Sequence, residues 1–301
     1  MIRLGVERAS ARLKYTEPHQ NFRTAKKGAL LREDTIFLRI AGTLLTKYKP
    51  TKSKLSTIKN ILCLNKTKLS TMSQNNNNMK SVLIIGATGA LGLQCLRHVA
   101  EAPTVGHVHV LCRTPSKFSD TDKRLCDSVI VGNARDAQDV EKALVASKAD
   151  YVILATGNGM DVTKSDTREK TGRALAKVML QPPFRHVKAI VVSSHGAADT
   201  KVKVGFGIGM MISYHLRHVF SDHTLQEQAF QEHELARRTV IVRPTSLTDE
   251  KGGNKIVEFN GQKKGPSISI DRSDVAEWIT NEISKTPTSF HGRKVCLTNA
   301  K

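Results

Sequence analysis

The sequence predicts an α/β protein with a doubly wound, mostly parallel sheet, and three observations lead to this fold class. Short apolar runs rich in β-branched residues, such as 81–85 and 151–155, have the composition of strands buried on both faces. Segments with helical spacing of apolar residues separate these runs, which indicates βαβ units with right-handed crossovers. The 301 residues, of which 39% are hydrophobic, suffice for one core of ordinary size.

The predicted elements begin at Lys80 and alternate along the chain. Val, Ile and Leu dominate each expected strand, and each expected helix repeats apolar residues three or four positions apart. The expected strands are 81–85, 108–112, 128–131, 151–155, 188–193 and 239–242, and the helices between them are 91–100, 137–146, 166–180 and 224–236. One further strand–helix–strand unit is expected at 267–270, 273–284 and 294–297.

The first 78 residues are predicted to be a disordered basic extension rather than a domain. They hold 16 Lys and Arg against 4 Asp and Glu, a net charge of +12 within the +20 of the chain, and end in four asparagines. This composition leaves open an organellar targeting peptide, mitochondrial or plastid, or a gene-model extension ahead of a true start at Met72 or Met79. Residues 79–301 form the predicted folded domain, expected in the cytoplasm unless 1–78 is a transit peptide.

Composition also argues against several classes of function. No apolar run reaches about 18 residues, so no membrane span is expected. Specific nucleic-acid binding is not expected, because most of the excess basic charge lies in 1–78 instead of on a folded surface; binding by that segment would rest on charge alone. The cysteines form no CxxC pair and no zinc spacing, so free thiols and no metal site are expected at Cys63, Cys95, Cys112, Cys126 and Cys296.

The strongest functional signal is a glycine-rich turn between the first strand and the first helix, Gly86-Ala-Thr-Gly-Ala-Leu-Gly92. Gly86 permits a tight turn, Gly89 lets a phosphate approach the backbone, and Gly92 lets the helix pack on the strand. The positive end of the helix dipole then faces the anion. In this strand–turn–helix context the pattern predicts a single Rossmann-like dinucleotide-binding domain; the alternative is a plain glycine turn.

Arg113 indicates which dinucleotide the domain prefers. It follows the second expected strand, 21 residues after Gly92. An acidic residue at this place would bind the ribose 2′-hydroxyl of NAD, whereas an arginine can pair with the 2′-phosphate of NADP. Lys117 adds a second positive charge nearby. The sequence therefore favours NADP(H) as cofactor, and the alternative is an arginine that is simply solvated at a strand end.

Four motifs carry a resemblance to a known family: the GATGALG turn, Val110-Leu-Cys-Arg113, Val131-Gly-Asn133 and Ile241-Val-Arg-Pro244. They resemble the atypical short-chain dehydrogenases of the NAD(P)-binding NmrA-like group, and within it the biliverdin-IXβ reductase/flavin reductase family. The resemblance covers roughly residues 80–300, and it implies that NADPH lies across the carboxyl ends of the strands. The cofactor contacts that it implies are Gly86, Thr88, Gly89, Ala90, Leu91, Gly92, Arg113, Asn133 (where the family usually has Asp), Ala134, Ala155, Thr156, Gly157, Ser193 and Pro244.

The same resemblance implies Ser194 and His223 as the catalytic residues. A conventional short-chain dehydrogenase instead uses a Tyr-x-x-x-Lys pair, whose tyrosine protonates the carbonyl oxygen. Here Tyr214 is followed four positions later by His218, so carbonyl reduction by that pair is not supported. The alternative readings are a strand-end hydroxyl for Ser194 and a helix cap or surface residue for His223.

The expected function is an NADPH-dependent reductase that transfers hydride to a small-molecule acceptor, planar and electron-poor, such as a flavin, quinone or tetrapyrrole. The proton would come from His223 or from solvent. The apolar segment 204–213, with three glycines and Met210 and Met211, is either a substrate lid or a buried loop or helix start. The alternative function is a non-catalytic NADP(H)-sensing regulator of the NmrA-like type, which also needs no Tyr-x-x-x-Lys pair. The residues do not define the oligomeric state.

Overall fold

The computed structural model describes residues 79–301 apart from 160, 206, 286–289, 291 and 301, so the predicted extension 1–78 lies outside the described residues. The main sheet has the order β3-β2-β1-β4-β5-β6-β10-β8, with parallel neighbours except for the pair β10–β8. This order confirms the predicted doubly wound, mostly parallel sheet. Its strands are β1 (Lys80–Ile85), β2 (Val105–Cys112), β3 (Ser128–Val131), β4 (Tyr151–Leu154), β5 (Lys188–Val192), β6 (Thr239–Pro244), β8 (Ile256–Phe259) and β10 (Lys294–Asn299).

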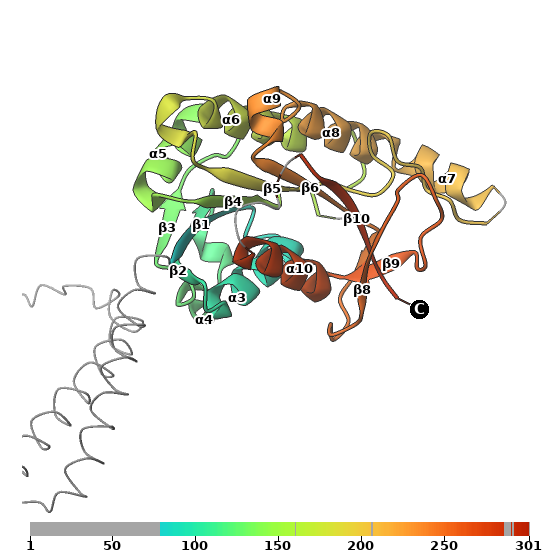
Figure 1. The fold of residues 1–301 in the computed structure, drawn as a ribbon, viewed down its shortest axis with the longest axis horizontal. Helices are drawn as coiled ribbons and strands as arrows, with labels where there is room; N and C mark the ends of the chain where they lie inside the picture. The colour runs from blue at the N-terminus through green and yellow to red at the C-terminus, as the bar shows by residue number, and fades with distance from the viewer. Residues whose placement is uncertain (1–78, 160, 206, 286–289, 291, 301) are drawn as a thin grey trace, which may run out of the picture. The chain divides into compact units, whose positions relative to one another are not determined.

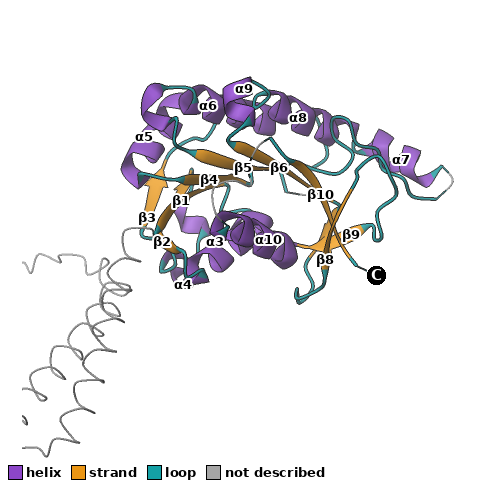
Figure 2. Cartoon of the chain, in the orientation of Figure 1, coloured by secondary structure: helices purple, strands orange, loops and turns teal. Residues whose placement is uncertain are grey.

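Helices cover both faces of the sheet (Figure 1), and Figure 2 shows the sheet between two helical layers. Val82 and Ile84 of β1 pack into the core on one face, while Leu83 and Ile85 pack into the core on the other. A strand buried on both faces is apolar throughout, which explains the lack of polar alternation in its sequence. One face carries α3 (Ala90–Glu101), α4 (Asp120–Lys123) and α10 (Arg272–Ser284), and the other α5 (Ala137–Ser147), α6 (Thr167–Met179), α8 (Arg217–Gln228) and α9 (His233–Ala236). Short 3₁₀ turns occur at η1 (Pro115–Lys117) and η2 (Pro182–Phe184).

The predicted helix 224–236 is wrong in its bounds. Helix α8 begins at Arg217 and ends at Gln228, and α9 is a separate short helix from His233. Phe220 and Asp222 are buried against neighbouring elements, so tertiary packing extends α8 toward its N-terminus. Another helix, α7 (Ile208–His215), begins inside the segment 204–213, which is predicted as a substrate lid or as a buried loop or helix start, and it projects beyond α8 (Figure 1).

The last strand–helix–strand unit is present, but its first strand does not join the main sheet. Strand β9 (Ser269–Asp271) pairs in parallel with β7 (Ser246–Thr248) in a separate two-stranded sheet. The place beside β6 is occupied by β10, which pairs with it in parallel. Strand β8, which the sequence analysis missed, then closes this edge by antiparallel pairing with β10.

Four of the five cysteines lie in the described residues, and none of these four forms a disulfide, as predicted. Burial raises the pKa of the Cys95 thiol to about 12 and that of Cys296 to about 11, so both stay protonated near neutral pH. Cys63 lies outside the described residues. Within the part of the chain that the structure describes, no helix has both the length and the apolar character needed to cross a bilayer.

A buried charge pair joins α8 to the sheet. Arg243 of β6 donates from Nε and Nη2 to the two carboxylate oxygens of Glu227, at 2.9 and 2.5 Å, and also lies 2.7 Å from Asp199. The hydroxyl of Ser193, which follows β5, donates to Glu227 at 2.6 Å. Both side chains of the Arg243–Glu227 pair are 2% exposed or less. Because neither charge reaches water, each depends on the other for its hydrogen bonds.

Replacing Glu227 with alanine is expected to lower the free energy of unfolding by about 3–5 kcal/mol, because the guanidinium of Arg243 would remain buried without its main partner. Urea denaturation followed by circular dichroism measures the change. Glu277→Ala, on the exposed side of α10, is the matched control and should change the free energy by less than about 0.5 kcal/mol. Equal effects of the two substitutions would contradict a stabilising role for the buried pair.

Candidate functional site

The glycine turn has the geometry that its sequence predicts. Gly86 has a φ of +96°, and a Cβ atom added there would lie 2.5 Å from the carbonyl oxygen of Ala155. A Cβ atom at Gly92 would lie 2.2 Å from the carbonyl oxygen of Gly86. Neither position can hold a side chain, which confirms the tight turn at Gly86 and the close helix packing at Gly92. Gly89 has room for a Cβ atom on the protein side, 3.4 Å from Gly86, and is itself exposed.

The amino end of α3 is open to an anion. Its N-cap is Gly89, which supplies no side-chain cap, and its first turn holds no acidic residue. Thr88 and Ala90 are exposed beside it, whereas the side chain of Leu91 is buried in the core, so Leu91 can offer only its backbone. The first amides of a helix point outward and carry the positive end of its dipole. This end of α3 therefore fits a phosphate group without obstruction.

Arg113 lies beside this turn at the carboxyl edge of the sheet. Ile85 of β1 is in register with Leu111 of β2, so Cys112 lies next to Gly86 and Arg113 starts the following loop. Arg113 is exposed, and it makes no hydrogen bond or ion pair with any residue that the structure describes. Lys117, in the short turn η1, is exposed on the same loop. A free guanidinium therefore lies one strand away from the glycine turn, and its contact with a 2′-phosphate stays a prediction.

Asn133 and Ala134 follow β3, the next strand outward. The backbone amide of Asn133 donates to Asp139 at 2.9 Å, and its side-chain oxygen accepts from the amide of Arg135 at 3.2 Å. The side-chain oxygen is thus already used in a local turn, which leaves the NH₂ group as the free donor of Asn133. Ala134 is half-buried beside it. Their predicted place near an adenine stays a prediction.

Ala155, Thr156 and Gly157 follow β4, on the other side of the point where the strand order reverses. Doubly wound sheets bind their ligands in the crevice at this reversal. The Thr156 hydroxyl lies 2.9 Å from the hydroxyl of Thr171 in α6. A Cβ atom at Gly157 would lie 3.2 Å from Nη2 of Arg168, so this buried guanidinium packs directly against the loop.

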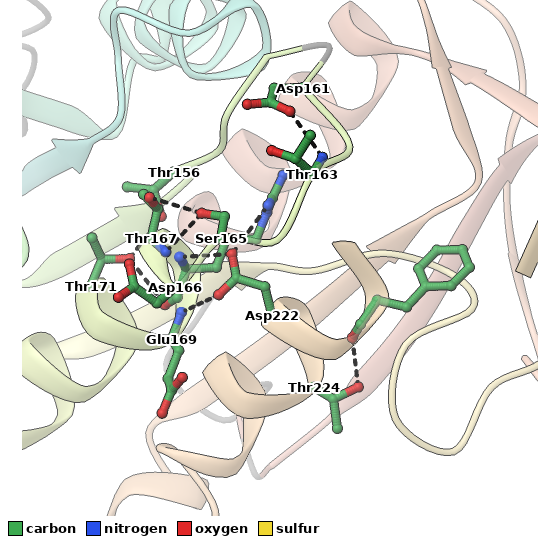
Figure 3. Close-up of polar contacts among 12 residues, drawn as sticks. Thr156, Asp161, Thr163, Ser165, Asp166, Thr167, Glu169, Thr171, Asp222 and Thr224 are labelled. Carbon is green, nitrogen blue, oxygen red and sulfur yellow. Dashed lines mark hydrogen bonds and ion pairs between the residues drawn. The ribbon is translucent and has the colours of Figure 1, made fainter. Parts of the chain in front are cut away.

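Arg168 belongs to a buried cluster that sequence reasoning missed. The carboxylate of Asp222 accepts hydrogen bonds from the backbone amides of Arg168 and Glu169 at 3.2 and 2.8 Å, and lies 3.3 Å from Nη1 of Arg168. Figure 3 shows Asp222 directed at the first turn of α6. The two residues are 54 positions apart, and no motif joins them. Their contact holds α8 against the start of α6, beside the loop that follows β4.

His223, the predicted proton donor, is buried next to Asp222 in α8. Burial, and next the positive charge of Arg168, lower the pKa of His223 from 6.5 to about 3. The imidazole is therefore neutral at physiological pH, and its Nδ1 atom has no hydrogen-bond partner among the described residues. A neutral, enclosed imidazole can orient a neighbouring group, but it holds no extra proton to deliver at pH 7. The reading of His223 as a surface residue is wrong.

The residues predicted at the ends of β5 and β6 have partners within the protein. Ser193 is buried and donates its hydroxyl to Glu227, so its side chain is directed into the α8 layer. Ser194 is half-buried, and its hydroxyl lies 3.2 Å from the carbonyl oxygen of His195. The carbonyl of Pro244 accepts from the amide of His195 at 2.9 Å. Of these two serines, Ser194 is the one whose hydroxyl makes only a weak hydrogen bond to its neighbour in the chain, so it can still bond a ligand at the carboxyl edge of the sheet.

Tyr214 does not lie in a catalytic arrangement. It belongs to α7, is 70% exposed, and its ring is covered by the guanidinium of Arg217 at 4.6 Å. Two pockets, of about 170 and 220 Å³, lie instead against β6 and β10. Neither is lined by a residue of the glycine turn or by Arg113. The described residues contain no cluster of three or more His, Cys, Asp or Glu side chains suited to a metal ion.

The chain matches the family described as NAD(P)H-binding over residues 86–286. It belongs to that family. The match begins at the first glycine of the turn and ends just past α10 in the sequence. The predicted binding of a nicotinamide dinucleotide is therefore confirmed at the level of NAD(P)H, and the uncapped turn described above fits its diphosphate. The site on α3 thus belongs to an oxidoreductase-type fold.

Several solved structures share this fold. A putative NAD-dependent epimerase/dehydratase from Bacillus halodurans has 22% identity and a TM-score of 0.57 over 74% of this chain and 95% of its own. A short-chain dehydrogenase/reductase from Veillonella parvula, in complex with NADP, has 15% identity and a TM-score of 0.60 over 73% and 94%. ChuY from Escherichia coli O157:H7, an anaerobillin reductase, has 20% identity and a TM-score of 0.55 over 72% and 96%.

A His223→Gln variant is expected to lose less stability in acid than the wild-type protein. The pKa of His223 is 6.5 in the unfolded wild-type chain and about 3 in the folded one. Between these two pH values the unfolded state binds a proton at His223, whereas the folded state does not. Stability therefore falls with pH through this window, by on the order of 1 kcal/mol per pH unit for this residue. The variant lacks this contribution. As the pH falls, its free energy of unfolding should therefore rise steadily relative to that of the wild-type protein.

Urea denaturation at several pH values between neutrality and about pH 4 measures this difference. His186→Gln, at an exposed position, is the matched control and should run parallel to the wild-type protein. Parallel curves for the His223 variant as well would show that His223 titrates normally and is not enclosed.

Proposed function

We propose that the protein is an NADPH-dependent reductase of the NmrA-like, biliverdin-IXβ reductase/flavin reductase type, which transfers hydride to a planar electron-poor acceptor. The observation that carries the proposal is Arg113, an exposed guanidinium without a partner in the described structure, one strand from a glycine turn that no side chain obstructs. NAD(P)H supplies the hydride when bound. The chain binds the diphosphate on backbone amides of α3 and selects the phosphorylated cofactor through Arg113.

The choice of NADPH follows from charge. The loop after β2 presents Arg113 and Lys117, where a domain selective for NADH would present an acidic side chain. The Veillonella parvula structure, whose fold is similar, holds NADP, and this supports the same choice. A 2′-phosphate would also gain two charge-assisted hydrogen bonds from a guanidinium fork, which a free ribose hydroxyl cannot accept in the same way.

The proposed class of hydride acceptor follows from the lack of a strong proton donor among the candidate residues. Tyr214 is exposed on α7, and His223 is neutral, so neither provides the strong proton donor that carbonyl reduction needs. Flavins, quinones and linear tetrapyrroles can take a proton from solvent after hydride transfer. The similar fold of an anaerobillin reductase supports the tetrapyrrole as a member of this class. Ser194 and the backbone at the ends of β4 and β5 would orient the acceptor.

Arg113→Ala is expected to weaken NADPH binding by about 10- to 100-fold and to leave NADH binding within about threefold, because only the 2′-phosphate contact is lost. Isothermal titration calorimetry of the full chain with each cofactor measures both affinities. Arg124→Ala, an exposed arginine in the same region, is the control for loss of charge alone. Equal weakening of NADPH binding by both variants would show that Arg113 makes no specific contact.

The full chain should oxidise NADPH, followed at the nicotinamide absorbance, when given a flavin, a quinone or a linear tetrapyrrole. Ser194→Ala should lower the turnover while NADPH affinity stays unchanged, since this hydroxyl would touch the acceptor and not the diphosphate. Tight NADPH binding with no turnover of any acceptor in the panel would contradict the reductase. Such a result, together with a partner protein whose affinity depends on NADPH against NADP⁺, would instead support the cofactor-sensing regulator.

A further inference from the structure

Helix α7 exposes an apolar face to solvent. Ile208, Met210, Met211 and Tyr214 are 48%, 75%, 66% and 70% exposed, and they form what we call the α7 patch. Residues three or four positions apart on a helix share a face, which places Tyr214 beside both methionines and Met211 beside Ile208. In a helix on the surface of a globular domain the apolar residues normally face the core. In α7 these four apolar residues face solvent instead.

The inward side of α7 is fixed by small residues, so the helix cannot simply rotate to bury its patch. Gly209 is buried, and a Cβ atom there would lie 2.3 Å from the carbonyl oxygen of Val202. The amide of Gly209 donates to Val204 at 3.0 Å, and the hydroxyl of Ser213 donates to Gly209 at 2.8 Å. The segment 202–204, which precedes α7, therefore packs against this side of the helix, and the α7 patch faces solvent.

The segment that carries the α7 patch is positively charged. Residues 200–221 contain Lys201, Lys203 and Arg217 and no Asp or Glu. The backbone amide of Lys201 donates to Gly261 at 3.4 Å, and Gln262 donates to the carbonyl oxygen of Asp199, so the turn after β8 lies against the start of this segment. That turn adds two exposed lysines, Lys263 and Lys264. The neighbouring carboxylate, Asp199, is paired with the buried Arg243.

We propose that the α7 patch and its lysines dock the protein on the surface of a membrane that contains anionic lipids. Apolar side chains of a projecting helix can enter the boundary between headgroups and acyl chains, while the lysines of the same segment and of the turn after β8 pair with lipid phosphates and carboxylates. Methionine and tyrosine suit this boundary, since the first is adaptable and the second has an apolar ring with a polar tip. The inference does not depend on the proposed reductase activity.

Charge argues against two other occupants. A symmetric dimer through α7 would bring the positively charged segments 200–221 of both copies together, and these residues offer no carboxylate to neutralise them. The segment 1–78 of this chain carries a net charge of +12, so it would add positive charge to a positive surface. An acidic protein would satisfy the charge, but the exposed apolar side chains lie on a helix that projects beyond α8 (Figure 1), which suits insertion into a lipid boundary.

Co-sedimentation of the full chain with vesicles tests the proposal. Binding should be at least about tenfold tighter to phosphatidylcholine mixed with phosphatidylserine than to phosphatidylcholine alone. The variant M210S/M211S/Y214S should weaken binding to the mixed vesicles by about tenfold or more, and K201E/K203E should reduce the preference for phosphatidylserine relative to the wild-type chain. All proteins compared carry residues 1–78, so any vesicle binding by that basic segment is common to them and the differences report the α7 patch.

Matched controls remove general effects of polarity and charge. Val145→Ser replaces a 61% exposed apolar residue on α5, and K142E/K177E reverses two exposed lysines on α5 and α6. Both controls should bind the mixed vesicles within about twofold of the wild-type chain. Urea denaturation should show that every variant is folded.

Tyr214→Trp provides a direct measure of insertion. The natural tryptophan, Trp278, is 7% exposed in α10, so a new signal reports position 214. Its fluorescence should shift to the blue with mixed vesicles and be quenched by lipids brominated on the acyl chains.

Two results would overturn the proposal. The first is equal vesicle binding by the wild-type chain and M210S/M211S/Y214S. The second is binding to poly-L-glutamate that depends on the α7 patch as strongly as vesicle binding does, because this would identify an acidic protein surface as the partner.

Discussion

Backbone atoms of the glycine turn pack against the end of β4 and the start of α3 so closely that no side chain fits between them. Gly86 meets the carbonyl of Ala155, and Gly92 meets the carbonyl of Gly86. This approach brings the uncapped amides of α3 to the point where the strand order reverses. The candidate site therefore follows from a packing constraint: the same absence of Cβ atoms that lets the helix dock on the sheet exposes the amides that fit a diphosphate.

Buried charges hold the remaining walls of the site in place. Asp222 accepts from the first amides of α6 and pairs with Arg168, which lies against Gly157 in the loop after β4. Glu227, one turn further along α8, binds Arg243 and the hydroxyl of Ser193. One helix thus fixes the ends of three neighbouring strands through carboxylates that water does not reach. Because these carboxylates are buried and bonded to groups of other elements, they position the carboxyl edge of the sheet.

These contacts limit which proton donors are present at the carboxyl edge of the sheet. His223 is enclosed beside Asp222 and remains neutral, and Tyr214 lies on the exposed side of α7. The chain offers Ser194, backbone groups and a cationic loop around Arg113, a set suited to holding and orienting a cofactor and an acceptor. Reactions whose product can be protonated by solvent need no more than this. The proposed reductase of planar acceptors is consistent with both the cofactor geometry and the weak proton supply.

The sequence by itself determined the features that depend on near neighbours in the chain. The strand–turn–helix at Gly86, the apolar strands of the sheet and Arg113 after β2 are local patterns, since backbone conformation and burial on both faces act within a few residues. Tertiary structure decided what depends on distant partners. The contact of Asp222 with Arg168 joins residues 54 positions apart. Strand β9 pairs with β7 outside the main sheet, because β10 occupies the place beside β6. Gly209 packs on Val202 and so fixes which side of α7 faces the fold. Which side chain meets water is settled by the competing elements around it, and no periodicity in one segment contains that information.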